Sequence, residues 1–268
     1  MNEMLASQSF LGLDSDAVLA NTTIGIVGLG GGGSHVSQQS AHLGIGRFVP
    51  VDHDIIEWRN LNRLVGGTAD DVRRELPKVN IAERVIRNVN PDAVVTPRQC
   101  RWQEATDELL GCDLIVGCVD SFREREELER FARRHLIPYI DLGMDVHAVG
   151  GRYCIGGQVV LSAPGGVCLR CLGIITDRRL TLEAQRYGSA GSKPQVVWAN
   201  GVLASIAVGL IAQLLTPWRD DHAVSVCCEF DGNRNRVETN RMDCLRNAKC
   251  SHYLDTELGD AFFNRLAR

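Results

Sequence analysis

The glycine-rich stretch at residues 24–34 constrains the fold of this chain more than any other feature of its sequence. An apolar, β-branched run leads into the pattern G-x-G-x-x-G at Gly28, Gly30 and Gly33, and residues 35–43 read as a helix. This order predicts a strand, a tight turn and a helix, because the turn needs backbone angles that glycine adopts and a phosphate must approach without meeting a Cβ. The next predicted strand ends in Asp52, where folds of this kind bind a ribose hydroxyl. The pattern therefore indicates a nucleotide site and leaves the identity of the nucleotide open.

The composition is that of an ordinary globular protein. Of 268 residues, 44% are hydrophobic and 23% are charged, and the formal net charge is −4. Nothing in this balance favours binding to nucleic acid or to an anionic membrane. No apolar run reaches about 18 residues without interruption, and the first residues carry no basic segment typical of a signal peptide. We therefore expect a cytoplasmic protein with no membrane or nucleic-acid partner.

Strand-like and helix-like segments alternate through the first half of the chain, which predicts an α/β fold with a doubly wound, Rossmann-like, mostly parallel sheet. After Gly143, glycine pairs punctuate short apolar runs that predict antiparallel strands extending this sheet. The predicted strands beyond residue 90 span 93–96, 113–120, 138–142, 146–154 and 158–162, with a hairpin over 223–237. The predicted helices after the glycine turn span 77–89, 104–110, 123–135 and 198–215, and residues 172–194 read as a polar loop.

Residues 54–76 form a polar segment that is unusually long for a plain connection between a strand and a helix, which favours a functional role. The segment contains Asn60 and Arg63, and it leads directly into Pro77 and Lys78. Lys78 is one of only three lysines in the chain, so a random surface lysine is a poor explanation for it. Asp120 stands at the carboxyl end of a buried strand, where doubly wound folds place their ligands.

Taken in order, these motifs resemble those of the ThiF/MoeB/HesA family of E1-like, ubiquitin-activating-like adenylyltransferases. The motifs that carry the resemblance are the glycine pattern, Asp52-x-Asp54, Asn60-x-x-Arg63, Pro77-Lys78 and Asp120. The resemblance implies an N-terminal docking segment over residues 1–22, an adenylation domain over 23–250 with a crossover loop at 172–197, and a C-terminal tail over 251–268. It also implies a homodimer that uses ATP and Mg²⁺ to adenylate the C-terminal carboxylate of a partner, with release of pyrophosphate. The implied partner is a ubiquitin-like or sulfur-carrier protein, or a precursor peptide.

The same resemblance assigns roles to the individual residues of the nucleotide site. The glycine turn would meet the phosphates, Asp52 would bind the ribose, and Asp120, together with Asp54, would hold Mg²⁺. The implied catalytic residues are Arg63, Lys78 and Asp120, and Asn60 would join Arg63 and Lys78 in a clamp on the polyphosphate. The turn residues implied to bind the nucleotide are Gly28, Gly30, Gly31, Gly32, Gly33 and Ser34.

The ten cysteines do not suggest a disulfide scaffold in a chain of this length. Cys168 and Cys171 form a C-x-x-C pair, and Cys244 and Cys250 form a wider pair far downstream. In the resembled family two cysteine pairs bind one structural Zn²⁺, and four thiolates satisfy tetrahedral zinc. Because the second pair is wider than the usual C-x-x-C, His252 is an alternative to Cys244 as the fourth ligand. A redox role of the first pair is the other alternative.

Two absences keep alternative functions open. The predicted crossover loop contains Ser189 and Ser192 but no cysteine, so we do not expect a thioester to form there. The stretch 4–8 ends in Gln8 and lacks the arginine that the family carries before its first strand, which leaves a non-catalytic, E1-like subunit or scaffold as an alternative. A more remote alternative is an NAD(P)-dependent oxidoreductase, which explains the glycine turn and Asp52 but not Lys78 or the cysteine pairs.

Overall fold

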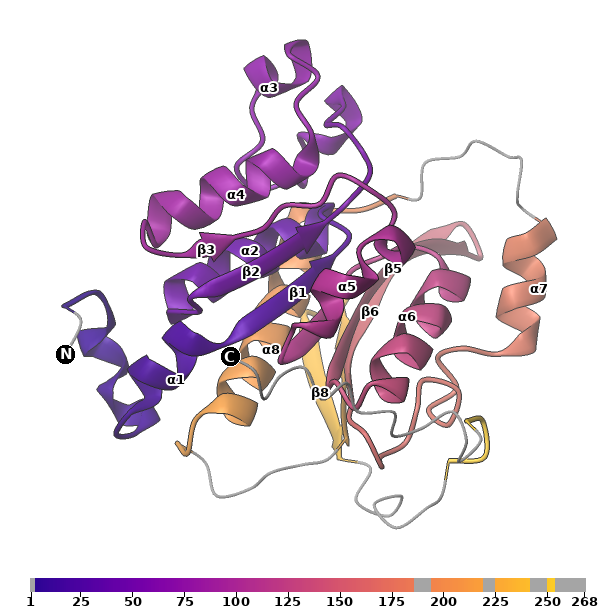
Figure 1. Ribbon diagram of the computed structural model, residues 1–268. Helices are drawn as coiled ribbons and strands as arrows, with labels where there is room; N and C mark the ends of the chain where they lie inside the picture. The colour runs from indigo at the N-terminus through magenta and orange to yellow at the C-terminus, as the bar shows by residue number, and fades with distance from the viewer. Residues whose placement is uncertain (1–2, 186–193, 219–224, 242–249, 254–268) are drawn as a thin grey trace.

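A computed structural model describes residues 3–185, 194–218, 225–241 and 250–253, and these form one α/β unit around an eight-stranded sheet (Figure 1). The strand order is β3-β2-β1-β4-β5-β6-β7-β8. The first five strands in this order are parallel, and the last three join them in antiparallel pairs. The predicted fold class, a doubly wound sheet with an antiparallel extension, is therefore confirmed.

The parallel half of the sheet positions the candidate nucleotide site. The chain runs from β1 (Thr23–Val27) outward through β2 (Arg47–Val51) to β3 (Val94–Val95), then returns to β4 (Leu114–Gly117) on the other side of β1. The strand order therefore reverses between β1 and β4, and open α/β sheets bind ligands outside the carboxyl ends of the strands at such a point. The glycine turn follows β1 and Asp120 follows β4, so both lie at this edge of the sheet.

The antiparallel half corrects one predicted strand. We expected a strand over residues 146–154, but the chain turns back in the middle of that range. β5 (Tyr139–Val149) and β6 (Arg152–Ser162) form one long hairpin whose turn is made by Gly150 and Gly151, with φ angles of 55° and 76°. Glycine takes this left-handed conformation at little cost, so the glycine pair marks a hairpin turn and not the interior of a strand. β7 (Ser225–Asp231) and β8 (Arg236–Arg241) form the predicted second hairpin.

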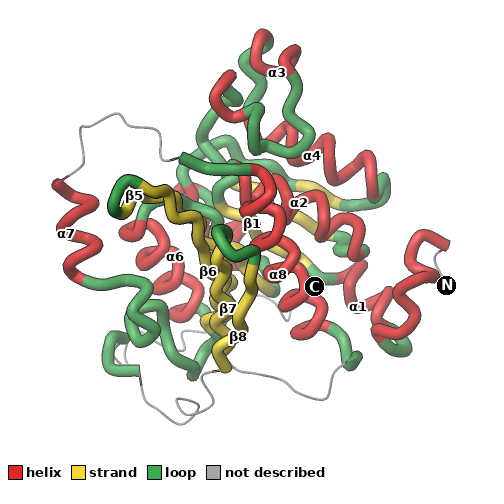
Figure 2. Tube along the Cα trace, turned by 180° about the vertical axis from the view of Figure 1, so that it is seen from behind, coloured by secondary structure: helices red, strands yellow, loops and turns green. Residues whose placement is uncertain are grey.

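Helices cover both faces of the sheet, as expected of a doubly wound fold. The side chains of Ile24 and Ile26 on β1 join a core cluster with residues of α2 (Gly31–Leu43), α4 (Lys78–Val89) and α8 (Val197–Leu215). Figure 2 shows α2 and α8 lying side by side on this face. Val27 points to the opposite face, where a second cluster includes residues of α5 (Thr106–Leu110), the short helix η3 (Trp102–Glu104) and α6 (Phe122–Arg134).

By length and composition α8 could cross a membrane, since it has an 18-residue window of mean hydropathy 1.7. Within the fold, 56% of that window is buried. The helix packs against α2, β5 and β6, so its apolar character is that of a core helix. At the N-terminus, η1 (Glu3–Leu11) and α1 (Ser15–Asn21) add Leu11 and Leu19 to the same core cluster.

Two polar segments of the chain contain short helices. The insertion between β2 and α4 holds η2 (Trp58–Asn60) and α3 (Ala69–Arg73), which stand at the top of Figure 1. Ile56, Leu64 and Val72 of this insertion form a small core of their own with Ile81 of α4. Part of the predicted loop at 172–194 is α7 (Asp177–Gln185), which lies beside α6.

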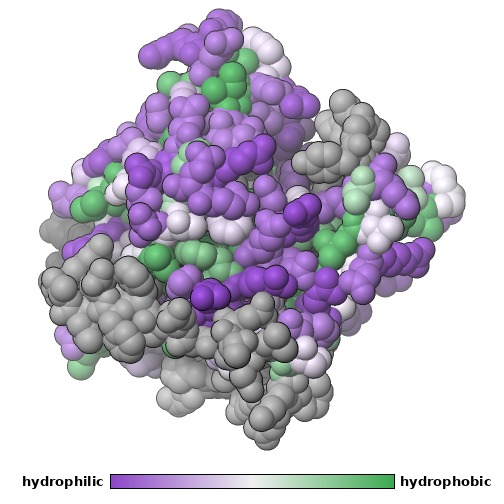
Figure 3. All heavy atoms as spheres, turned by 45° about the vertical axis from the view of Figure 1, so that its right-hand side comes forward, coloured by the Kyte–Doolittle hydropathy of each residue, from purple (hydrophilic) through white to green (hydrophobic). Residues whose placement is uncertain are grey.

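Polar residues cover most of the coloured surface in Figure 3, and apolar residues lie on it in small patches. Helix α6 is an example of how polar residues come to cover the surface. Most of its residues are charged, and its buried apolar side chains are those of Leu128 and Ala132. Its buried charged residues, Arg125, Glu129 and Arg133, are the exception to this pattern and all have partners inside the fold.

Candidate active site

The glycine turn after β1 leaves room for a phosphate at one position. Gly28 has a φ of +87°, and a Cβ built on Gly33 would lie 1.9 Å from the carbonyl oxygen of Gly28, so neither residue tolerates a side chain. At Gly30, in contrast, an added Cβ meets nothing within 4 Å. Gly30 is also the residue that precedes α2, whose N-terminus has no side-chain cap. The turn therefore combines open space with the uncapped, positively polarised end of a helix, which is a suitable place for an anion.

The helix α2 begins at Gly31, four residues before the expected start at residue 35. Gly31 and Gly32 are glycines for reasons of packing. A Cβ on Gly31 would lie 2.4 Å from the side-chain nitrogen of Asn200, and one on Gly32 would lie 2.7 Å from Leu142. Asn200 belongs to the first turn of α8 and is 2% exposed. Asn200 was not among the predicted site residues, although a polar amide inside an otherwise apolar helix is a signal that the sequence shows.

Asp52, Asp54 and Lys78 lie together at the carboxyl end of β2. The ammonium nitrogen of Lys78 is 2.6 Å from Oδ2 of Asp54 and 3.9 Å from Oδ2 of Asp52. Lys78 is the first residue of α4, and its backbone N–H donates to the carbonyl oxygen of Asp54. Asp52 accepts hydrogen bonds from the backbone N–H groups of Leu29, at 2.7 Å, and Asp54, at 2.8 Å. Asp52 thus fixes the glycine turn in place next to a buried cation.

The ionisation of Asp54 follows from these contacts. Partial burial alone would raise the pKa of Asp54, but the hydrogen bond and charge of Lys78, with smaller contributions from His53 and Arg59, outweigh burial and lower it. Asp54 is therefore a carboxylate at neutral pH. Asp52, His53 and Asp54 offer ligand atoms within 4.8 Å of one another, an arrangement with the ligand types that a divalent cation uses.

Asn60 and Arg63 lie on the insertion, and Ser34 ties this insertion to the glycine turn. The side-chain oxygen of Asn60 accepts a hydrogen bond from the N–H of Glu57. Arg63 donates to the carbonyl oxygen of Arg59 at 2.6 Å. The hydroxyl of Ser34 donates to the carbonyl oxygen of Gly31 and accepts from the N–H of Val65, both at 3.0 Å. Ser34 thus positions the segment that carries Arg63, a role that sequence reasoning had not given it.

Asp120 is exposed, and two segments that precede and follow the undescribed residues 186–193 meet beside it. Gln195 donates a hydrogen bond of 2.9 Å to Oδ1 of Asp120. Glu183 of α7 accepts hydrogen bonds of 3.1 Å from the backbone N–H groups of Phe122 and Arg123 and from the hydroxyl of Ser121. The carboxylate of Glu183 thus caps the N-terminus of α6 directly after Asp120. Within the described residues, the segment 172–197 is docked at the carboxyl end of β4.

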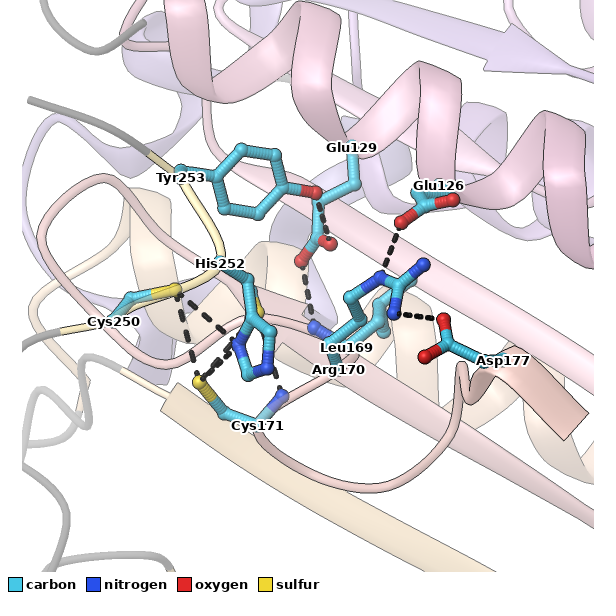
Figure 4. Close-up of polar contacts among 10 residues, drawn as sticks. Glu126, Glu129, Leu169, Arg170, Cys171, Asp177, Cys250, His252 and Tyr253 are labelled. Atoms are coloured by element: carbon cyan, nitrogen blue, oxygen red, sulfur yellow. Dashed lines mark hydrogen bonds and ion pairs between the residues drawn. The ribbon is translucent and has the colours of Figure 1, made fainter. Parts of the chain in front are cut away.

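A second cluster brings together Cys168, Cys171, Cys250 and His252, whose ligand atoms all lie within 4.8 Å of one another (Figure 4). Sγ of Cys171 lies 3.5 Å from Sγ of Cys168 and 3.7 Å from Sγ of Cys250. Nδ1 of His252 lies 3.4 Å from Sγ of Cys171 and 3.5 Å from Sγ of Cys168. The predicted ligand Cys244 lies outside the described residues. The histidine that we considered as its alternative lies among the three cysteines.

The thiols of this cluster differ in their surroundings. Burial raises the pKa of Cys168 well above its ordinary value, and the charge of Glu129 raises it further. Burial would also raise the pKa of Cys250, but hydrogen bonds from the backbone of His252 and from the neighbouring thiols lower it overall. Three thiols and an imidazole in one group are a donor set that structural zinc sites use.

Comparison with known proteins identifies the family. The ThiF family matches residues 2–252, which is nearly the whole sequence, and the chain therefore belongs to the ThiF family. This result confirms the resemblance that the ordered motifs had indicated.

Curated relatives include adenylyltransferases and activating enzymes. A SAMP-activating enzyme E1 from Haloferax volcanii is 32% identical over 164 residues, which cover 60% of this chain and 57% of the relative. A sulfur carrier protein ThiS adenylyltransferase from Bacillus subtilis is 28% identical and covers 84% of this chain and 62% of its own length. The corresponding protein from Escherichia coli is 29% identical and covers 77% and 79%. The chain thus spans about three-fifths of the length of the first two relatives.

Solved structures share the fold. Escherichia coli MccB with SeMet MccA matches with a TM-score of 0.73 at 21% identity, covering 90% of this chain and 72% of MccB. MccB with ATP matches with a TM-score of 0.71 at 22% identity, covering 94% and 74%. At this level of identity the similarity establishes the fold.

Proposed function

We propose that this chain is an ATP- and Mg²⁺-dependent adenylyltransferase. Its proposed substrate is the C-terminal carboxylate of a ubiquitin-like or sulfur-carrier protein or of a precursor peptide. The observation that carries the proposal is the buried ammonium group of Lys78, held by Asp52 and Asp54 beside a glycine turn with open space at Gly30. A buried cation beside this turn suits the triphosphate of ATP, which carries more negative charge than the diphosphate bridge of a nicotinamide dinucleotide. Membership of the ThiF family and the names of the curated relatives support the same activity.

In the proposed reaction a carboxylate oxygen of the acceptor bonds to the α-phosphorus of ATP. The bond from that phosphorus to the oxygen bridging it to the β-phosphate breaks, and pyrophosphate leaves with the electron pair. Catalysis of such a transfer rests on positioning and on stabilising the charge that develops on the phosphates. Lys78, Arg63 and Asn60 would supply that charge and those hydrogen bonds, and Asp52 would bind the ribose.

The backbone N–H groups at Gly31, Gly32 and Gly33 would face the phosphates from the end of α2, with Gly28 and Ser34 holding the turn in shape. Asp120 and Asp54 would hold Mg²⁺, which normally binds through one or two carboxylates and the phosphates of the substrate. The ion would neutralise phosphate charge.

We also propose a structural Zn²⁺ bound by Cys168, Cys171, Cys250 and His252, in place of the all-cysteine set that includes Cys244. What supports this choice is the position of Nδ1 of His252 among the three sulfur atoms. Four such ligands complete the tetrahedral coordination of a structural zinc. The ion would join the chain near residue 170 to the chain near residue 250.

The proposed activity is tested by exchange of labelled pyrophosphate into ATP. The protein is incubated with ATP, Mg²⁺ and a panel of acceptors that end in a free carboxylate. We expect exchange that depends on the acceptor and falls at least about a hundredfold in Lys78→Ala, because a charged hydrogen-bonding group facing the phosphates is lost. Arg47→Ala is the matched control, since Arg47 is an exposed cation at the opposite end of β2. The absence of both exchange and ATP binding would refute the proposal.

A second candidate, a subunit that needs a partner to adenylate, is favoured by the absence of an arginine from residues 4–8. Gln8, at the end of this stretch, donates a hydrogen bond to the carbonyl oxygen of His42 at the end of α2 remote from the glycine turn. A mixture with a second E1-like chain that is active when neither chain is active alone would support this candidate. Pyrophosphate exchange by the isolated protein would exclude it.

The remaining proposals concern the whole chain. We propose a homodimer that acts in the cytoplasm, with residues 1–22 as a docking segment, 23–250 as the adenylation domain and 251–268 as a tail. The family resemblance supports the homodimer and the division of the chain. The burial of α8 within the fold supports the proposed location in the cytoplasm.

A further inference from the structure

The proposed metal centre is assembled from two parts of the chain that are about 80 residues apart. Cys168 and Cys171 lie on the turn after β6, and Cys250 and His252 lie near the C-terminus. A metal ion that had to bring these parts together by itself would also have to order both segments, and ordering each residue costs conformational entropy. An element that holds both parts in advance would lower this cost.

Glu129 of α6 contacts both parts. One carboxylate oxygen accepts a hydrogen bond of 2.9 Å from the N–H of Leu169, which lies between the two cysteines of the C-x-x-C turn. The other accepts a hydrogen bond of 2.8 Å from the hydroxyl of Tyr253, the residue after His252. Figure 4 shows the carboxylate between these two groups, next to the cysteines and His252. Each of these two hydrogen bonds is therefore donated by the residue that directly follows a proposed zinc ligand, Cys168 or His252.

Glu129 is fully buried, and such a carboxylate persists only where the fold supplies partners. Arg133, one turn further along α6, is also buried and lies 5.1 Å from the ring of Tyr253. Arg133 donates to the carbonyl oxygen of Gly166, just before the C-x-x-C turn, at 2.8 Å. Burial raises the pKa of Glu129, and hydrogen bonds from Ser162, Tyr253 and Leu169 and the charge of Arg133 act against that rise.

A further contact fixes the same turn from outside. Arg170, the second residue between the cysteines, pairs with Glu126 of α6 and donates to Asp177 of α7 at 2.8 Å. These contacts hold the C-x-x-C turn against α6, but they do not reach the segment of Cys250. Among the described residues, the hydrogen bonds that join both ligand segments to one side chain are those of Glu129.

We propose that Glu129 is a positioning residue of the zinc centre, and that it acts with Tyr253 to hold the two ligand segments together before the metal binds. This inference rests on the zinc site proposed above. Side chains that orient metal ligands in this way typically change metal affinity by about 10- to 100-fold when they are replaced.

The test measures zinc content and zinc affinity, the latter by competition with a chromophoric chelator. We expect one zinc per wild-type chain and a dissociation constant raised by about 10- to 100-fold in Glu129→Gln and in Tyr253→Phe. The glutamine variant keeps one acceptor oxygen and places its NH₂ group against one of the two donors, and the phenylalanine variant removes only the hydroxyl. Glu127→Gln is the matched control, because Glu127 is a partly exposed carboxylate on the same helix that pairs with Arg123 and not with a ligand segment.

A second readout separates positioning from folding. Co²⁺ bound to thiolates absorbs through charge transfer, so its titration reports the ligand set directly. Tyr253→Phe should reach the wild-type spectrum at a higher cobalt concentration, whereas Cys171→Ser should never reach it. Wild-type affinity in both Tyr253→Phe and Glu129→Gln would overturn this inference alone. The absence of zinc and of a cobalt–thiolate band in the wild type would overturn the zinc site and this inference together.

Discussion

An added Cβ would meet no neighbouring atom at Gly30, whereas at Gly31 and Gly33 it would disturb the packing of the turn. An added Cβ at Gly33 would collide with the carbonyl oxygen of Gly28, and one at Gly31 would collide with Asn200. Neither glycine can therefore be used to test function without disturbing the fold. At Gly30 the φ angle is −73°, and the space where a Cβ would lie is open. The same space would receive a phosphate under the proposed function.

Gly30→Ala is expected to fold normally and to bind ATP poorly. Its Tm should stay within about 3 °C of the wild type, because a helix N-cap tolerates glycine or alanine with a difference of a fraction of a kcal/mol to about 1 kcal/mol. Its dissociation constant for ATP, measured by calorimetry, should rise at least about tenfold through loss of phosphate contacts worth about 1.5 kcal/mol or more. Gly33→Ala should instead lose stability. Unchanged ATP affinity in Gly30→Ala would show that phosphates do not approach this turn.

Individual residues were predictable where the sequence places them at strand ends. Asp52 and Asp120 follow predicted strands, and Lys78 begins a helix marked by Pro77. The contacts of Glu129, Glu183 and Asn200 could not be predicted, because their partners lie elsewhere in the chain. On helix sequence alone, Glu129 is one more charge on a highly charged helix.

At the scale of elements, hydrogen bonds and an ion pair hold the insertion between β2 and α4 against α4. Asp71 in α3 is 2% exposed and accepts hydrogen bonds from the guanidinium of Arg84 on α4, at 2.7 and 2.6 Å. It also caps α3 through hydrogen bonds with Thr68. Because Arg84 also donates to the carbonyl oxygen of Gly66, one ion pair holds both sides of the insertion against α4. This arrangement fixes the segment that carries Arg63.

Asp71→Asn should lower the free energy of unfolding by about 2 kcal/mol at pH 7, because a buried, charge-assisted pair is lost. The hydrogen bonds of Arg84 hold the pKa of Asp71 far below its ordinary value. A carboxyl group with a lowered pKa stabilises the fold above its unfolded pKa of about 4, and this stabilisation is lost as the pH falls through the folded-state value.

The difference between variant and wild type in urea unfolding should therefore be largest at pH 7 and 5 and shrink below about pH 4. Asp70→Asn is the matched control, because Asp70 is exposed and pairs with Arg74 only at 3.7 Å, so its loss should cost less than about 1 kcal/mol. A difference that is independent of pH would contradict the assigned role of the Asp71 charge.

Two features at this scale were not predicted from the sequence, the hairpin turn between β5 and β6 and the helix α7. Apolar periodicity predicted the order of strands and helices and the antiparallel extension. It did not distinguish the turn at Gly150 and Gly151 from the interior of one strand over residues 146–154, because extended runs continue on both sides of it. Nor did it reveal α7, whose residues are all at least partly exposed and which is held by polar contacts from Arg170 and Glu183. A helix without a buried apolar face gives no periodic signal.

At the scale of the whole molecule, helices α2 and α4 of the nucleotide site pack on one apolar cluster, and the C-x-x-C turn packs on the other. The glycine turn and Lys78 belong to elements whose apolar residues join the cluster of α2, α4 and α8. The C-x-x-C turn contributes Leu169 to the other cluster, with α5 and α6. α6 begins two residues after Asp120, and about two turns later its Glu129 contacts Leu169 and Tyr253, the neighbours of proposed zinc ligands. The two centres therefore share α6, whereas α2 and α4 of the nucleotide site pack on a cluster that the C-x-x-C turn does not join.

The two-core arrangement predicts the effect of removing the metal. Cys171→Ser should lower the Tm by several degrees, because the ends of the zinc-linked segments are released. ATP at 100 times its dissociation constant stabilises a folded protein by about 2.7 kcal/mol, which corresponds to a rise in Tm of about 5 °C or more for a chain of this size. The same rise should appear in Cys171→Ser, because α2, which follows the glycine turn, and α4, which begins at Lys78, pack on the other core. At the same ATP concentration a tenfold higher dissociation constant leaves about 1.4 kcal/mol of stabilisation, so the rise in Gly30→Ala should be about half of the wild-type rise or less. Thermal unfolding with and without ATP and Mg²⁺ measures all three, and loss of the ATP effect in Cys171→Ser would mean that α6 transmits the state of the zinc site to Asp120.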